Sequence, residues 1–379
     1  MKTLLINGSR SDWGYFRPVI DEFKSRGLTP TLLHCNMSVL PKYGDLTFEV
    51  EKQGYKADYR INCAYDGDNH YASAKMTGSL LSSIADILYN ESFDWILLAG
   101  DRPEQLAAAV AASQMYVPIA HIQAGERSGN IDGITRHAIS KLAHLHFAAN
   151  AEASQRLANM GEEPWRIKNT GAPQLDELID FRTNPKSNFL KKHSIEAYKF
   201  ILFSFHSVTE EYGELTSTLH ELELVIEAIK EKIVFIAPNN DAGSDRIMEL
   251  FHRKRRADDL IFLNVRREDF LQLMYYAKFM IGNSSASILE APVFKTPAIN
   301  VGRRQKDRTQ SSNVINADNS FCSVMNSIAK LEELKLYQRN YECRSIYGDE
   351  PASGKIVSIL SDFLYTYDKD TILRRDITW

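Results

Sequence analysis

The feature that most constrains this 379-residue chain is the alternation of apolar runs and helical patterns across residues 95–149. Residues 95–99, 117–122 and 144–149 have the length and composition of buried strands. The segments between them carry apolar side chains at helical spacing, for example Leu106, Ala107, Val110, Ala111 and Met115. Strands that alternate with helices predict right-handed crossovers and a parallel sheet with helices on both faces.

The same alternation begins at residue 3 and starts again near residue 198. In the first part we expect further strands at residues 3–7, 30–35 and 165–170, and helices at residues 74–89 and 152–160. In the second part we expect strands at residues 200–205, 233–237, 260–265, 279–281 and 297–301, with helices at residues 214–229 and 268–277. The expected fold class is α/β, with two Rossmann-like, doubly wound parallel sheets whose strand ends face a cleft.

The length of the chain exceeds that of a comfortable single core, so two domains are expected. We predict an N-terminal domain of residues 1–180 and a C-terminal domain of residues 198–355. Residues 181–197 are predicted as the linker, because residues 181–193 are mostly polar, contain an Asn-Pro pair and lack periodicity. Residues 356–379 form a tail with an amphipathic start, which could pack back on the N-terminal domain.

Composition and charge exclude several classes of protein. The net charge is −4 and basic residues are spread throughout, which argues against a nucleic-acid or membrane partner. The chain starts directly with a strand pattern and has no apolar run of membrane-spanning length, so a cytoplasmic location is expected. The cysteines at positions 35, 63, 322 and 343 are isolated, which predicts free thiols and no metal site.

Two successive strand ends in the first part carry candidate chemistry. Open parallel sheets bind ligands outside the carboxyl ends of their strands. Gly-Asp-Arg at residues 100–102 follows one strand, and residues 123–132, dense in charge and glycine, follow the next. One such turn would be explained by a helix cap, and Asp101 could cap the helix that begins at Pro103. Two in succession favour a site.

Two further turns are suited to binding phosphate. Residues 8–14 join a strand to a helix and contain two glycines, yet match neither the dinucleotide G-x-G-x-x-G motif nor the P-loop. Gly-Asn-Ser-Ser at residues 282–285 leads into a helix, where unpaired N–H groups and hydroxyls could hold a diphosphate. Ordinary capping by Ser284 is the alternative.

Together these motifs resemble the hydrolysing UDP-N-acetylglucosamine 2-epimerases, enzymes that begin sialic acid synthesis. The resemblance extends from about residue 2 to beyond residue 302, and its most specific pieces are residues 100–102, 121–126, 128–132, 136–142, 239–244 and 282–285. It implies a GT-B type fold, a UDP-sugar substrate, UDP as a product, no added redox cofactor, and a homodimer or dimer-based tetramer.

The reaction implied by the resemblance is anti elimination of UDP to a glycal, followed by hydration to free N-acetylmannosamine. Asp101 and Asp132 match the catalytic aspartates of the family. The residues that match contacts to nucleotide, phosphate or sugar are Arg10, Ser11, Arg102, His206, Asn239, Val265, Ser284, Ser285, Glu290 and Arg304.

The chain departs from the family pattern at Gln123, where a glutamate is expected. An amide does not exchange a proton at ordinary pH, so the acid/base role could pass to Glu126. Our hypothesis is that Asp101, Asp132 and Glu126 carry the chemistry while Gln123 binds the sugar. Arg136 and His137 are expected on the wall of the active site. For His137, as for His121, a satisfied core histidine is the alternative.

Several functional alternatives stay open from the sequence. The substrate could be UDP-2,4-diacetamido-2,4,6-trideoxyglucose, an intermediate on the way to legionaminic acid. A GT-B glycosyltransferase would share the UDP residues but need an acceptor. A non-hydrolysing epimerase and a two-domain binding protein are the remaining classes.

Overall fold

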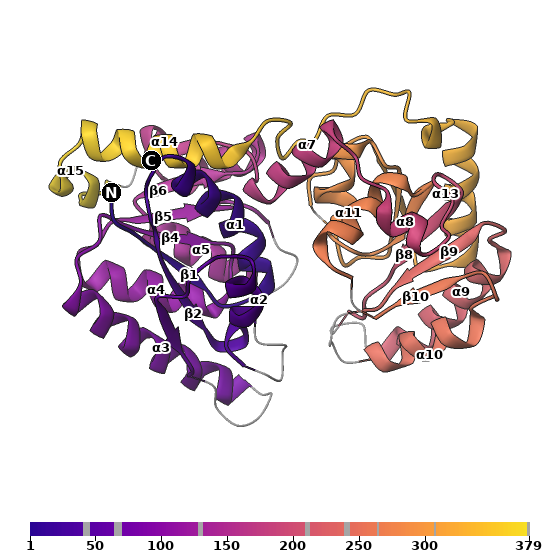
Figure 1. The fold of residues 1–379 in the computed structure, drawn as a ribbon, viewed down its shortest axis with the longest axis horizontal. Helices are drawn as coiled ribbons and strands as arrows, with labels where there is room; N and C mark the ends of the chain where they lie inside the picture. The colour runs from indigo at the N-terminus through magenta and orange to yellow at the C-terminus, as the bar shows by residue number, and fades with distance from the viewer. Residues whose placement is uncertain are drawn as a thin grey trace. The chain divides into compact units, whose positions relative to one another are not determined.

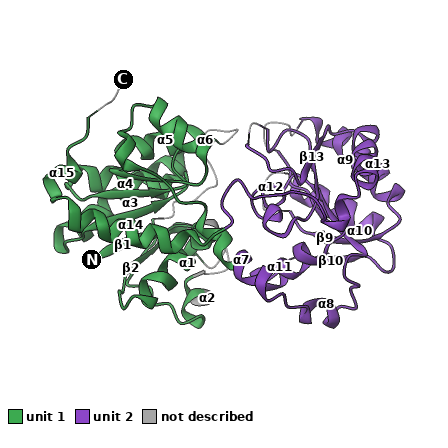
Figure 2. Ribbon diagram, turned by 90° about the horizontal axis from the view of Figure 1, so that it is seen from above, with its two compact units in different colours: residues 1–177, 350–379 green, residues 178–349 purple. Residues whose placement is uncertain are grey.

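A computed structural model describes residues 1–40, 46–63, 70–127, 132–208, 213–238, 243–263, 265–306 and 308–376. The chain divides into two compact units (Figures 1 and 2). Unit 1 comprises Met1–Glu177 and Glu350–Trp379, and unit 2 comprises Leu178–Asp349. Each unit is built on a parallel sheet with helices, so the expected α/β fold class is confirmed.

The described part of unit 1 contains a seven-stranded parallel sheet in the order β3-β2-β1-β4-β5-β6-β7. Its strands are β1 (Thr3–Asn7), β2 (Thr31–Cys35), β3 (Tyr59–Ile61), β4 (Trp95–Ala99), β5 (Ile119–Ile122), β6 (Leu145–Ala148) and β7 (Ile167–Asn169). The central strands β1, β4, β5 and β6 are buried along their whole length, because helices cover both faces of the sheet.

The helices of unit 1 are α1 (Arg10–Ser25), α2 (Leu46–Lys52), α3 (His70–Asn90), α4 (Pro103–Gln114), α5 (Asp132–Leu142), α6 (Ala151–Asn159), α14 (Ala352–Thr366) and α15 (Lys369–Leu373). One face of the sheet packs against α1 and α14, and the other packs against α3 and α4. The tail, with α14 and α15 coloured toward yellow in Figure 1, therefore completes the first core. Leu360 is fully buried there, and its carbonyl accepts a hydrogen bond from Trp95 Nε1 at 3.2 Å.

The described part of unit 2 contains a six-stranded parallel sheet in the order β10-β9-β8-β11-β12-β13. Its strands are β8 (Phe200–Ser204), β9 (Lys232–Ile236), β10 (Leu260–Phe262), β11 (Phe279–Gly282), β12 (Ala298–Val301) and β13 (Val314–Ala317). Its helices are α8 (Asn188–Lys192), α9 (Leu215–Ala228), α10 (Ser244–Lys254), α11 (Arg267–Tyr276), α12 (Ala286–Leu289) and α13 (Phe321–Glu333). Phe203, Phe235 and Phe251 contact one another in its core, in tilted and edge-to-face arrangements.

The stretch expected as a linker, residues 181–197, packs against unit 2 instead. The two units divide inside α7 (Asp176–Thr183), after Glu177. Phe181 contacts the ring of Phe294, and Phe189 contacts the ring of Phe262. The few apolar side chains of this polar stretch are therefore used in packing, which its lack of periodicity concealed.

Short strands account for the other differences from the predicted elements. β3 and β13 were not predicted, because each is only three or four residues long and partly exposed. The strand expected at residues 260–265 ends at Phe262. No helix in the described ranges is long and apolar enough to cross a bilayer.

A buried amide joins three elements near the carboxyl end of β1. Gln105 Nε2 donates to the carbonyl of Ile6 at 2.7 Å and to Asp12 Oδ2 at 3.3 Å, and Gln105 Oε1 accepts from Ala99 N at 3.2 Å. Asp12 Oδ2 also accepts from the backbone N–H of Gly8 at 2.9 Å. Burial, and then the charge of Glu104, raise the pKa of Asp12 from 3.8 to about 7.

The raised pKa of Asp12 predicts a stability that falls with increasing pH. Between about pH 4 and pH 7 the folded chain keeps a proton that the unfolded chain releases, so the contribution is complete below pH 4 and is lost as pH rises through 7. A shift of this size corresponds to on the order of 4 kcal/mol. Asp12→Asn should remove this dependence, measured as urea midpoints at pH 5 and pH 8.

The matched control is Glu22→Gln, which neutralises a partly exposed carboxylate on the same helix, paired with Arg26. It should leave the pH dependence as in the wild type. Parallel pH profiles for wild type and Asp12→Asn would contradict the prediction.

Candidate active site

The turn after β4 is held by a buried ion pair. Asp101 Oδ2 accepts from Nη2 of Arg136, which lies in the middle of α5. Arg136 is 5% exposed; burial lowers its pKa, but the charges of Asp101, Tyr15 and Glu126 outweigh burial and raise it overall. The guanidinium therefore stays charged and favours the ionised form of Asp101. The alternative role of Asp101 as a helix cap is wrong, because Arg102 occupies the N-cap position of α4.

The turn after β5 is shaped by two residues in the left-handed region. Gln123 has φ +62° and Gly125 has φ +75°. A Cβ at Gly125 would lie 2.5 Å from the carbonyl oxygen of Ala153, so only glycine allows this turn to approach α6 so closely. Gln123 presents its carbonyl to Arg136 Nη1 at 3.5 Å, while its side-chain Nε2 donates to Gln174 Oε1 at 3.4 Å.

Glu126 follows this turn and is buried against the end of β6. Its Oε1 accepts from Asn150 Nδ2 at 2.7 Å, and its side chain lies close enough to Arg136 to raise the pKa of that guanidinium. The structure thus places Asp101, Gln123 and Glu126 around one arginine, although 25 positions separate the first and the last. Two of the three are carboxylates, and each lies beside the charge of Arg136.

The two histidines of this region have different settings. His121 is fully buried on β5, where its ring contacts the Gly100 carbonyl at 2.7 Å and Ser140 Oγ at 3.1 Å. Burial lowers the pKa of His121 to about 3, so it is a neutral core histidine. His137 on α5 also has a pKa lowered, by burial first and then by Arg156. Within the described residues, its buried Nδ1 has no hydrogen-bond partner.

The other unit 1 residues singled out from the sequence lie at the same edge of the sheet. Arg102 Nε is 3.5 Å from Glu104 Oε2. Arg10 and Ser11 are the first two residues of α1, directly after the N-cap Ser9, and Asp132 is the first residue of α5. The side chains of these three are outside the described part of the structure. Strand-end placement is therefore observed for the backbone of all of them.

In unit 2 the Gly-Asn-Ser-Ser turn joins three strand ends. Gly282 has φ +138°, and a Cβ there would lie 1.8 Å from the carbonyl oxygen of Ser204 on β8. Asn283 Oδ1 accepts from the backbone N–H of His206 at 2.7 Å, and Asn283 Nδ2 donates to the His206 carbonyl at 2.8 Å. The Asn283 carbonyl accepts from Arg304 Nη1 at 3.1 Å and from Gln305 Nε2 at 3.0 Å. This one residue connects the loops after β8, β11 and β12.

The helix expected after this turn is short, since α12 comprises only Ala286–Leu289. Ser285 is its N-cap, and the Ser284 hydroxyl accepts weakly from Ala286 N at 3.4 Å, so Ser284 is not a strong cap. Glu290 follows the helix and pairs with Arg267 Nη1 at 2.6 Å. Val265 lies two residues before Arg267 in the sequence. Asn239 is outside the described residues.

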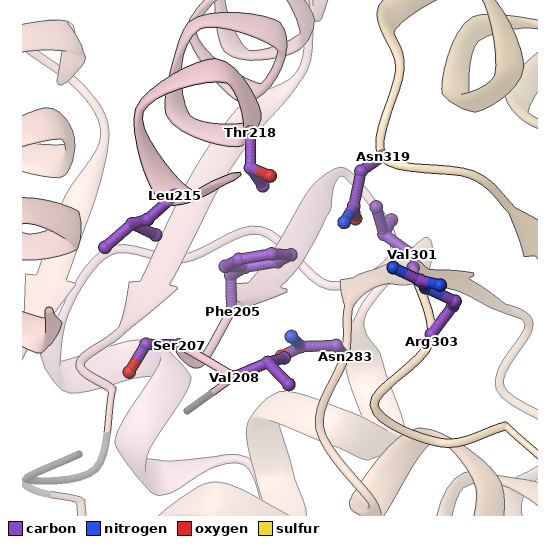
Figure 3. Close-up of a pocket in the computed structure, with 10 residues that line it drawn as sticks. Phe205, Ser207, Val208, Leu215, Thr218, Asn283, Val301, Arg303 and Asn319 are labelled. Atoms are coloured by element: carbon purple, nitrogen blue, oxygen red, sulfur yellow. The ribbon is translucent and has the colours of Figure 1, made fainter. Parts of the chain in front are cut away.

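Burial lowers the pKa of His206 to about 4, with a further contribution from Arg304, so its imidazole is neutral at ordinary pH. Beside this histidine, unit 2 contains a small cavity of about 10 Å³, which holds roughly one water molecule rather than a nucleotide. Figure 3 shows the side chains that line this cavity, among them Phe205, Thr218 and Asn319. In the described ranges, no three His, Cys, Asp or Glu side chains are grouped to hold a metal ion.

Sequence reasoning missed the residues that hold the candidate groups in place. Asn150, Gln174 and Arg267 contact Glu126, Gln123 and Glu290 respectively. Asp12 on α1 and Glu104 on α4 are also buried. A local signal existed only for Asp12, since Ser9 and Asp12 have the spacing of an N-terminal capping box.

Comparisons with known proteins identify the family of the chain. The sequence model of the UDP-N-acetylglucosamine 2-epimerase family matches residues 21–361. The UDP-N,N'-diacetylbacillosamine 2-epimerase (hydrolyzing) of Legionella pneumophila is 31% identical over 363 residues, with 95% of each chain covered. The UDP-N-acetylglucosamine 2-epimerase of Neisseria meningitidis serogroup B is 32% identical over 329 residues, with 86% of each chain covered.

A solved structure supports the fold. The UDP-GlcNAc 2-epimerase from Neisseria meningitidis, described as bound to UDP-GlcNAc, superposes with a TM-score of 0.80 at 21% identity and covers 96% of this chain and 100% of its own. The resemblance inferred from the sequence motifs is confirmed by the family match over most of the chain. The chain belongs to the UDP-N-acetylglucosamine 2-epimerase family.

Proposed function

We propose that this protein is a hydrolysing 2-epimerase that converts UDP-N-acetylglucosamine and water into free N-acetylmannosamine and UDP. The observation that carries the proposal is the pair of carboxylates, Asp101 and Glu126, placed around the buried Arg136 at the strand ends of unit 1, in a chain of this family. The name of the Legionella relative, which includes the word hydrolyzing, supports the choice of the hydrolytic outcome.

In the elimination step a base removes the hydrogen on C2 of the sugar. The C1–O bond to UDP breaks and its electron pair leaves with the diphosphate, so that a C1=C2 double bond forms. Because the C2 hydrogen is only weakly acidic, the base must be ionised and the leaving group stabilised. Glu126 and Asp101 are held in settings that favour their charged forms, and Asp132 is the third proposed carboxylate.

In the hydration step the oxygen of water adds to C1. A proton adds to C2 from the face of the ring opposite to the one that lost the hydrogen in the first step. The group that took the first proton and the group that gives the second can be different carboxylates, which explains a need for more than one. Gln123 binds the sugar in this proposal, because its amide cannot transfer the proton. The hydration step adds one water molecule across the double bond that the loss of UDP created. Neither step changes the overall oxidation state of the sugar, so the reaction requires no redox cofactor.

We assign binding of the UDP moiety to the strand-end loops of unit 2. His206, Ser284, Ser285 and Arg304 are joined there through the turn at Asn283. Arginine and backbone N–H groups suit a diphosphate, and the carboxylate of Glu290 suits ribose hydroxyls. Asn239 and Val265, with Arg10, Ser11 and Arg102 of unit 1, complete the proposed contacts to the nucleotide.

The second candidate substrate is UDP-2,4-diacetamido-2,4,6-trideoxyglucose, favoured by the name of the Legionella relative. The experiment is incubation of the purified protein with each UDP-sugar in deuterated water, followed by proton NMR. Release of UDP and a free 2-epimer that carries deuterium at C2 supports the proposal and identifies the substrate. Return of a UDP-linked epimer indicates the non-hydrolysing reaction, and no conversion without an acceptor indicates a transferase.

Replacing Glu126 with glutamine should lower kcat/KM by roughly 100-fold or more, because an amide cannot relay a proton. Thermal stability should change little, since glutamine keeps an acceptor for Asn150 Nδ2. Steady-state rates and unfolding temperatures provide the measurement. The control is Glu152→Gln, which removes an exposed carboxylate from the neighbouring helix α6. Turnover of Glu126→Gln within a few-fold of wild type would dismiss the assignment.

Replacing Glu290 with glutamine should weaken binding of UDP by about tenfold, because a hydrogen bond to a charged acceptor is worth about 1 to 1.5 kcal/mol more than one to a neutral acceptor. Isothermal titration with UDP measures this without any catalytic step. Glu333→Gln, an exposed change on α13, is the control. An unchanged Kd for Glu290→Gln would mean that Glu290 serves only as the partner of Arg267.

A further inference from the structure

The contact between Asn150 and Glu126 has a direction that the geometry fixes. Asn150 is the N-cap of α6, and its Oδ1 accepts from the backbone N–H of Ala153 at 2.8 Å. The other end of the same amide, Nδ2, donates to Glu126 Oε1 at 2.7 Å. Both side chains are at most 5% exposed.

The helix terminus decides which amide atom faces the carboxylate. A backbone N–H can only donate, so the atom of Asn150 that meets Ala153 must be oxygen, and the atom left for Glu126 must be the NH₂ group. An NH₂ group is only a donor, so it bonds to a carboxylate oxygen that accepts. The cap thus fixes the orientation of the amide, and the amide favours the ionised form of Glu126.

The close packing of two loops keeps this contact short. Gly125 lies against the first turn of α6, where even a methyl group would overlap the Ala153 carbonyl. Arg156 of the same helix donates to the Gly125 carbonyl. The backbone next to Glu126 is therefore held against the helix that Asn150 caps.

We infer that Asn150 is a positioning residue for catalysis: its amide, oriented by the terminus of α6, holds Glu126 as an ionised acceptor. This inference rests on the proposed function, in which Glu126 exchanges protons with the sugar. Among the described residues, the charged guanidinium of Arg136 from α5 and the neutral donor amide of Asn150 from the end of β6 act on Glu126.

Asn150→Asp separates capping from positioning. Aspartate caps a helix as well as asparagine does, so a purely structural role predicts wild-type stability and kinetics. A positioning role predicts a carboxylate that repels Glu126 and cannot donate. The acidic limb of the pH profile of kcat/KM should then move to higher pH, and kcat/KM at pH 7 should fall by roughly tenfold or more.

The double variant Glu126→Gln with Asn150→Asp reverses the donor and the acceptor. The hydrogen bond between positions 126 and 150 can form again in the double variant. Its unfolding temperature should therefore lie above that of Asn150→Asp and close to that of wild type, while activity stays lost. The control Ser320→Asp makes the same exchange of a neutral cap for an acidic one on α13, and it should move neither stability nor the pH profile.

An unmoved pH profile and unchanged kcat/KM in Asn150→Asp would overturn the inference. If that variant does not fold, Asn150→Ser takes its place, because serine keeps the cap acceptor but does not reach Glu126. An unmoved pH profile in Asn150→Ser would also overturn the inference. A wild-type protein that converts neither UDP-sugar would refute the proposed function alone. The contact would still be tested by thermal unfolding, where additive effects of Glu126→Gln and Asn150→Asp would overturn it.

Discussion

The positive charge of Arg136, buried in unit 1, is the constraint on which the candidate active site depends. Taking a guanidinium out of water costs several kcal/mol unless an opposite charge and hydrogen bonds compensate. Asp101 supplies the charge, and the carbonyl of Gln123 accepts a second bond. Because these partners follow β4 and β5, balancing one buried charge also fixes two strand-end turns against α5.

In unit 2 the strand-end loops are fixed through a single amide residue. The amide of Asn283 pairs with both backbone groups of His206, and its own carbonyl receives side chains from the loop after β12. Gly282 makes this possible, since any side chain there would overlap β8. A single asparagine after a glycine therefore holds three loops together, which suits a surface that binds a large, polar ligand.

Prediction from the sequence succeeded where the signal is local. The buried strands β1, β4 and β8 are continuous apolar runs, and their neighbours along the chain have clear helical spacing. It did not identify Arg136, 35 residues away, as the partner of Asp101, and the helix cap offered as the alternative role of Asp101 is not observed. The partner of Glu126 is 24 residues away, and that of Glu290 is 23 residues away. Pairings at such distances leave no periodic trace.

The sequence by itself determined the two parallel α/β sheets, the position of the charged turns at strand ends, and membership of the epimerase family. These follow from periodicity and from short motifs, which are properties of neighbouring residues. Only the tertiary structure decided that the C-terminal helix α14 completes the first core, that residues 181–197 belong with the second, and which amide orients which carboxylate. The physical reason is that burial and hydrogen bonding between distant segments depend on packing, which spacing along the chain does not encode.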